Sequence, residues 1–254
     1  MQKLGPLQFI DVDVASAFSS NRSLGRDPSR AASSLSPSAP ILVLFHGFGA
    51  DAYDLQTLGG DWLQSGFSRF IFPQGFLEVS IGPGWTGRAW WPISARQFAE
   101  WQSLSQKRDL DLSVLVPDGL ALAREKALQF LQALRQHNPQ APLVLGGFSQ
   151  GAMLAMDAAL YLETPPKALL VLSGQMLARE QWSLRQAQLR NMSVFLSHGD
   201  ADPVLPISGS HRLESFLRTA GAHVKTHFFR GAHEIPPEVV GSCFEFLQGV
   251  ARSK

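Results

Sequence analysis

Short apolar runs alternate with longer, helix-favouring segments along most of this chain of 254 residues. Short runs of apolar or β-branched residues predict buried strands, and apolar residues spaced three or four apart predict helices. The predicted strands are Leu7–Val14, Ile41–Phe45, Phe67–Phe72, Leu143–Leu145, Ala168–Leu172, Val194–Ser197 and Val224–Phe229. The predicted helices are Tyr53–Leu58, Val116–His137, Ala152–Leu160, Ile207–Ala220 and Pro237–Val250. This alternation predicts an α/β fold, with a mostly parallel central sheet and helices on both faces.

Two stretches depart from the alternation. Residues 15–40 are rich in Ser, Arg, Pro and Ala, which predicts a flexible polar loop or insertion. Residues 74–94 are too rich in glycine for a regular helix or strand and carry Trp85, Trp90 and Trp91. Their flat rings are suited to walling a substrate pocket, but the same rings could instead be buried to fix a long loop. The sequence leaves both interpretations open.

Composition narrows the class of protein. The length suits one large domain spanning residues 1–254, and the formal net charge of +1 gives no indication of a nucleic-acid partner. Cys243 is the only cysteine, which fits a reducing compartment. We find neither a signal peptide nor an apolar run long enough to span a membrane, so we expect a cytoplasmic protein without stable membrane insertion. Nothing in the sequence indicates a particular oligomeric state.

The segment Gly147-Phe148-Ser149-Gln150-Gly151 lies between a predicted strand and a predicted helix. A serine on such a sharp turn has its hydroxyl exposed above the sheet, in a strained backbone position that side chains at the flanking glycine sites would obstruct. The positive end of the following helix points at this serine, where negative charge develops during acyl transfer. The pattern therefore predicts that Ser149 is a nucleophile. The alternative is a Gly-rich turn in which Ser149 is a helix N-cap.

Three further strand ends carry candidate chemistry. His46-Gly47-Phe48-Gly49 follows a predicted strand, and its backbone N–H groups could face a neighbouring strand end; a plain turn with a structural His46 is the alternative. The segment His198-Gly199-Asp200-Ala201-Asp202 has no strong metal-ligand spacing, so we expect no metal and favour an aspartate that orients a histidine. His233 lies in the loop after the last predicted strand. Ser149, Asp202 and His233 thus occur in the order used by α/β-hydrolases.

These motifs resemble those of the phospholipase/carboxylesterase family of α/β-hydrolases, which includes bacterial carboxylesterases and acyl-protein thioesterases. The resemblance spans roughly residues 41–249, and Gly-Phe-Ser-Gln-Gly is its most characteristic segment. It implies Ser149 as the nucleophile, His233 as the general base and Asp202, rather than Asp200, as the partner of the histidine. It also implies an oxyanion hole built from the backbone N–H groups of Phe48 and Gln150.

The resulting expectation is a cofactor-free hydrolase of carboxylic esters, acting on a small molecule or an acylated protein. Acyl-protein thioesterase and lysophospholipase activities are the alternatives within the same chemistry. A catalytically inactive binding protein on the same fold is the alternative outside it. The tryptophans Trp85, Trp90 and Trp91 are expected to line the substrate site.

Overall fold

The computed structural model describes residues 1–20, 36, 38–94, 96, 97, 99, 101, 103 and 111–253. Within this part of the chain, eight strands form one sheet in the order β1-β2-β4-β3-β7-β8-β9-β10. The strands are β1 (Gln2–Leu4), β2 (Leu7–Asp13), β3 (Ile41–Phe45), β4 (Arg69–Pro73), β7 (Leu143–Phe148), β8 (Ala168–Leu172), β9 (Ser193–Gly199) and β10 (His223–Phe229). The pairs β1–β2 and β2–β4 are antiparallel, and the other neighbours are parallel.

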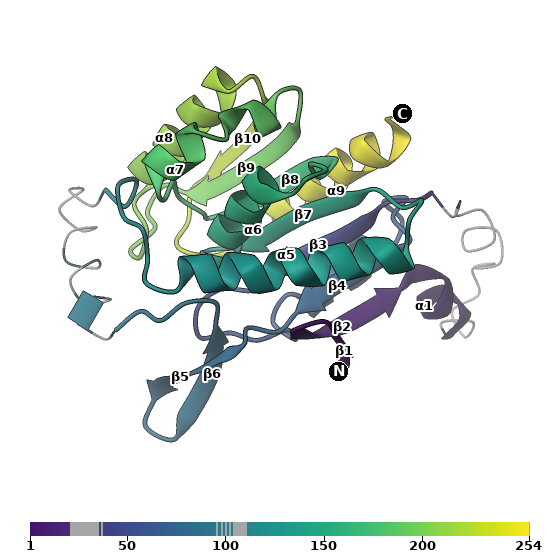
Figure 1. Cartoon of the computed structure of the whole chain (residues 1–254), viewed down its shortest axis with the longest axis horizontal. Helices are drawn as coiled ribbons and strands as arrows, with labels where there is room; N and C mark the ends of the chain where they lie inside the picture. Colours follow the sequence, from purple (N-terminus) through teal and green to yellow (C-terminus); the bar gives the residue numbers. More distant parts are fainter. Residues whose placement is uncertain are drawn as a thin grey trace.

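Helices cover both faces of this sheet (Figure 1). The helical elements are α1 (Val14–Ser20), α3 (Gln56–Asp61), α5 (Leu120–His137), α6 (Gln150–Tyr161), α7 (Arg179–Ser183), a 3₁₀ turn (Gln186–Leu189), α8 (Ile207–Thr219) and α9 (Pro237–Arg252). Strand side chains alternate between two cores. In β3, Val43 packs in the core that contains α5, α6 and α8, whereas Leu42 and Leu44 pack in the core that contains α3 and α9. The predicted α/β sheet with two covered faces is confirmed.

The prediction that residues 74–94 form neither a regular helix nor a strand is wrong, because this segment contains two strands. β5 (Leu77–Gly82) and β6 (Trp85–Ala89) form an antiparallel hairpin that projects from the body of the molecule (Figure 1). Two of its glycines occupy positions where a larger residue would be strained or would collide. Gly84 has φ +75° in the turn, a conformation that favours glycine, and Gly87 lies against the backbone of Gly49, where a side chain would collide.

The start of the predicted polar loop, residues 15–40, is helical, because Val14–Ser20 form helix α1. Residues 21–35 and 37 of the predicted loop lie outside the described residues. No helix in the described part of the chain is long and apolar enough to cross a membrane.

Candidate active site

Ser149 lies on the turn between β7 and α6 with φ 53° and ψ −119°, a left-handed conformation that is rare for a residue with a side chain. Two neighbouring glycines allow this tight turn. A Cβ atom on Gly147 would come within 2.5 Å of the Gly151 backbone, and one on Gly151 would come within 2.0 Å of the Phe45 carbonyl oxygen. The turn therefore packs directly on the end of β3 and holds the Ser149 side chain at the carboxyl edge of the sheet.

Asp202 and His233 are joined across two other strand-end loops. His233 Nδ1 lies 2.6 Å from Asp202 Oδ2, while the N–H groups of Val204 and Leu205 each donate to Asp202 Oδ1 at 2.8 Å. Burial opposes ionisation of Asp202, but hydrogen bonds from His198 and His233 outweigh it and hold the pKa of this carboxyl well below its usual range. An ionised carboxylate accepts only, so Nδ1 of His233 carries the ring proton and Nε2 is left as a base.

The His233 ring also packs beside the nucleophile turn. Its centroid lies 4.7 Å from that of Phe148, the residue before Ser149. No hydrogen bond joins the Ser149 hydroxyl to His233 within the described residues. Such contacts between nucleophile and base often tighten only when substrate binds.

Asp200 occupies a different position from Asp202. It is exposed, and its Oδ1 accepts a hydrogen bond from the Gly231 N–H at 3.3 Å. Backbone bonds from Asp200 to Phe229 and from Ala201 to Gly231 fasten the same two loops together. Asp200 therefore shapes the turn, while Asp202 faces the imidazole of His233.

The loop after β3 lies beside the nucleophile turn, because a Cβ atom on Gly47, the residue before Phe48, would come within 3.5 Å of Ser149 Cβ. Among the described residues, the N–H groups of Phe48 and Gln150 have no hydrogen-bond partner. The loop is braced by the hairpin, because Gly49 N–H donates to the Arg88 carbonyl and Arg88 N–H donates to the Ala50 carbonyl, both at 2.8 Å. Both N–H groups thus lack an acceptor within the described residues, which is a condition that an oxyanion hole has to meet.

His46 fixes the start of that loop. Its Nδ1 donates to the Gly47 carbonyl at 2.7 Å, and its Nε2 accepts from the Gly75 N–H at 2.9 Å. Burial lowers the pKa of His46 to about 4, partly offset by the Gly47 hydrogen bond. The ring is thus neutral at pH 7, and its role in this structure is to connect the ends of β3 and β4.

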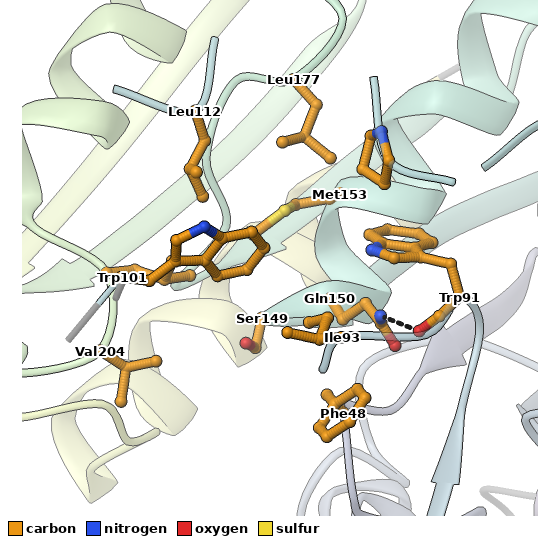
Figure 2. A pocket seen from close by; sticks show the side chains of 12 residues that line it. Phe48, Trp91, Ile93, Trp101, Leu112, Ser149, Gln150, Met153, Leu177 and Val204 are labelled. Carbon is orange, nitrogen blue, oxygen red and sulfur yellow. Dashed lines mark hydrogen bonds between the residues drawn. The ribbon is translucent and has the colours of Figure 1, made fainter. Parts of the chain in front are cut away.

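An apolar cavity of about 40 Å³, called the Ser149 cavity below, opens beside the nucleophile (Figure 2). It is lined by Phe48, Trp91, Ile93, Trp101, Leu112, Pro117, Ser149, Gln150, Met153, Leu177, Val204 and Leu205. A neighbouring cavity of about 270 Å³ shares Trp91, Ile93, Trp101 and Pro117 with it. The sequence did not single out Met153 or Leu177. Met153 could have been predicted, because it follows Ser149 by one helical turn on α6 and therefore lies on the same face of the helix. No such sequence signal points to Leu177.

The three tryptophans of the predicted wall occupy different environments. Trp91 lines both cavities. Trp90 is 1% exposed and outside the lining; its Nε1 donates to the His46 carbonyl at 2.9 Å. Trp85 is 73% exposed on β6. The wall prediction thus fits the position of Trp91, whereas Trp90 anchors the loop beneath the site and Trp85 lies at the surface of the hairpin.

The Gln150 side chain connects the nucleophile turn to this wall. Its Oε1 accepts from the Trp90 backbone N–H at 3.0 Å. Its Nε2 donates to the Trp91 carbonyl at 2.9 Å, as Figure 2 shows. Gln150 is 2% exposed, so both bonds are shielded from water. The same residue therefore presents a free backbone N–H beside Ser149 and fixes the position of Trp91.

Within the described residues, no three His, Cys, Asp or Glu side chains are grouped so that they could hold a metal ion.

A mostly parallel sheet with a serine on a strained turn between strand and helix defines the α/β-hydrolase fold. The chain belongs to the phospholipase/carboxylesterase family of that fold, because the family's sequence profile matches residues 28–251. It is therefore a hydrolase of the esterase and thioesterase class.

Individual relatives agree with this membership. Acyl-protein thioesterase 1 of Kluyveromyces lactis is 24% identical over 86% of this chain and 95% of its own length. Acyl-protein thioesterase 1 of Candida albicans is 26% identical over 84% and 93%. Among solved structures, esterase PE8 is 28% identical with a TM-score of 0.69, covering 85% of this chain and 95% of its own. The Bacillus cereus carboxylesterase, 19% identical with a TM-score of 0.65 over 96% and 95%, shares the fold.

Proposed function

We propose that this hydrolase cleaves carboxylic esters by an acyl-enzyme mechanism, with Ser149 as nucleophile, His233 as general base and Asp202 as the partner of His233. The observation that carries the proposal is the 2.6 Å contact between His233 Nδ1 and Asp202 Oδ2, beside the strained turn of Ser149. This contact places the proton of the neutral ring on Nδ1, so Nε2 is the nitrogen that can act as the general base.

The reaction proceeds in two halves. His233 Nε2 takes the Ser149 proton as Oγ attacks the acyl carbonyl, and the resulting oxyanion accepts hydrogen bonds from the Phe48 and Gln150 N–H groups. Asp202 stabilises the imidazolium, which then gives its proton to the departing alcohol or thiol. His233 then takes a proton from water, which attacks the acyl-enzyme, and returns that proton to Ser149 Oγ as the bond between Oγ and the acyl carbon breaks and the acid leaves. Each step uses side chains, backbone and water, so no cofactor takes part.

The Ser149 cavity supports a short apolar acyl group as the preferred substrate portion. A cavity needs about 10–15 Å³ to hold one water molecule, so the Ser149 cavity of about 40 Å³ has room for a small apolar group only. Met153 and Leu177 contribute apolar side chains to its lining. The neighbouring cavity of about 270 Å³ suits a larger leaving group. The relatives named acyl-protein thioesterase 1 support thioesters as a second substrate class, because both leaving groups suit the same serine chemistry.

The test is hydrolysis of p-nitrophenyl butyrate, with its thioester analogue beside it. We expect Ser149→Ala or His233→Ala to lower kcat by a factor of about 10⁶, and Asp202→Ala by a factor of about 10⁴.

Ser173→Ala is the matched control, since Ser173 also follows a strand with positive φ (50°) but is fully buried. It should retain activity. A folded Ser149→Ala protein that hydrolyses the ester at the wild-type rate would refute the proposal, and a wild type inactive on both esters would favour the binding-protein alternative.

A further inference from the structure

Another cavity, called the Arg88 cavity below, lies between the first two strands of the sheet and the β5–β6 hairpin. It has a volume of about 240 Å³, and its lining includes Lys3, Pro6, Gln74, Phe76 and Arg88. It shares no lining residue with the Ser149 cavity or with the larger cavity beside that one. The ester-hydrolysis mechanism makes no use of this space.

Three cationic side chains from three elements lie at this cavity. Lys3 on β1 and Arg88 on β6 are part of its lining. Lys126 on α5 approaches it at Phe76, because Lys126 Nζ lies 5.2 Å from the centroid of that ring.

These cations are poorly matched by carboxylates. Among the described residues, neither Lys3 nor Lys126 forms an ion pair. Arg88 pairs with Glu78 at 3.3 Å, but the Glu78 side chain is 60% exposed, and an ion pair so open to water contributes little. The unmatched positive charge therefore makes the cavity attractive to an anion.

Gln74 adds a neutral donor to the same cavity. Gln74 is 8% exposed, and its Oε1 accepts from the Ala52 N–H at 2.7 Å. This bond fixes the orientation of the amide, and the two protons of Nε2 have no acceptor among the described residues. Nε2 is not sealed from solvent, so it faces the cavity that Gln74 lines. A side chain that is nine-tenths buried and keeps two unused donors calls for an acceptor from outside the chain.

We propose that the Arg88 cavity binds a phosphate group, carried by a small monoester or present as free phosphate. A phosphate carries a charge of about −1.5 to −2 at pH 7, and its oxygens accept hydrogen bonds. The planar guanidinium of Arg88 suits two of these oxygens, Lys3 supplies a point charge, and Gln74 Nε2 donates a further bond.

The size and the remaining lining of the cavity fit the same ligand. One water molecule needs about 10–15 Å³, so about 240 Å³ admits a phosphate together with a small organic group. Pro6 and Phe76 offer apolar surface to that group. This site goes beyond the proposed ester hydrolysis and does not depend on it.

Calorimetric titration of the full chain tests the site, with inorganic phosphate and phenyl phosphate as probes at constant ionic strength. Arg88→Met should raise the Kd of phosphate at least about tenfold, the low end of the loss when a hydrogen-bonded charge is removed. Gln74→Glu keeps an acceptor for the Ala52 N–H but replaces the Nε2 donor by negative charge, so it should abolish binding. Lys3→Met changes an exposed residue and should weaken binding by a smaller factor.

Arg218→Met is the matched control. Arg218 is also a partly exposed arginine that pairs with a glutamate, Glu214, at 2.9 Å, but it does not line the cavity. Its Kd for phosphate should equal that of the wild type. No binding to the wild type at millimolar phosphate, an unchanged Kd in folded Gln74→Glu and Lys3→Met, or an equal loss in Arg218→Met would each overturn the proposal.

Two comparisons locate the phosphate and identify its source. Phosphate in the Arg88 cavity leaves the Ser149 cavity open, so it should not compete with an ester substrate; competitive inhibition that persists in Gln74→Glu would place it at Ser149 and refute the site. Tighter binding of phenyl phosphate than of inorganic phosphate would identify an organic monoester as the ligand, and weaker binding would identify the free ion. The titration needs no substrate, so its result is independent of the proposed hydrolysis.

Discussion

At the scale of single residues, the site depends on two buried histidines that have different hydrogen-bonding partners. His46 is 1% exposed and His198 is fully buried. The partners of His46 are one acceptor and one donor, so a neutral ring satisfies both. The ring of His198 lies between the Leu205 carbonyl oxygen and the Ser210 hydroxyl. Burial and its own two partners together therefore keep the His46 ring neutral.

The neutrality of His46 predicts a pH dependence of stability. Its pKa is lowered from 6.5 to about 4 in the folded protein, so the unfolded chain binds the additional proton between these values. The contribution is fully present above pH 6.5 and is lost as pH falls toward 4, by about 3 kcal/mol in total at 1.36 kcal/mol per pKa unit.

Urea unfolding between pH 7 and pH 4 measures this effect. The free energy of unfolding of the wild type should fall more steeply than that of His46→Gln, which has no proton to gain. The comparison uses slopes, so a variant that is less stable at every pH still serves. Parallel curves for the two proteins would contradict the assignment of this loss to His46.

At the scale of elements, the β5–β6 hairpin supports the loop that carries Phe48. A Cβ atom on Gly87 would lie 1.9 Å from the Gly49 carbonyl oxygen, so Gly87→Ala forces the hairpin or the loop to move. We expect kcat to fall by about 10², the typical cost of displacing one oxyanion donor, with a smaller change in KM. Gly82→Ala in the same hairpin is the control, because a Cβ there meets nothing within 4 Å. Equal kcat values for the two variants would separate the hairpin from catalysis.

The hairpin also illustrates which elements the sequence could predict. The buried strands were predictable because each is a local apolar run, and the sheet confirms them. Residues 74–94 were predicted as a loop because glycine lowers strand propensity. That penalty is outweighed at Gly87 by a contact with Gly49, which is distant in sequence. Propensity reflects the local chain and contains no information about such a contact.

At the scale of the whole molecule, the candidate site collects the ends of β3, β7, β9 and β10 at one edge of the sheet. Topology explains why Ser149, Asp202 and His233 could be proposed from sequence, because the strand ends of a parallel sheet share one edge. The wall of the Ser149 cavity was not predictable in the same way. Met153 and Leu177 reach it from α6 and from the segment after β8, and only the folded packing brings them together.

The same packing predicts different outcomes for the three tryptophans. Trp91→Ala enlarges the Ser149 cavity. The ratio of kcat/KM for an octanoate ester to kcat/KM for an acetate ester should therefore rise by about tenfold, the lower limit of the discrimination that an apolar pocket achieves.

Trp90→Ala should cost about 3–5 kcal/mol of stability with the chain-length preference retained. Trp85→Ala should change neither. The measurements are kcat/KM for a series of p-nitrophenyl esters and thermal melts; a wild-type chain-length profile in Trp91→Ala would remove Trp91 from the wall.

The only cysteine of the chain has a practical consequence. Cys243 is fully buried in α9, and burial raises the pKa of its thiol, so the reactive thiolate is scarce and inaccessible in the folded protein. A thiol reagent added to the native enzyme therefore has no competing target. A cysteine introduced at an exposed position such as Leu184, which is 87% exposed, would be labelled selectively without first removing the natural one. A fluorescent or spin label can therefore be attached to the introduced cysteine while Cys243 remains in the core.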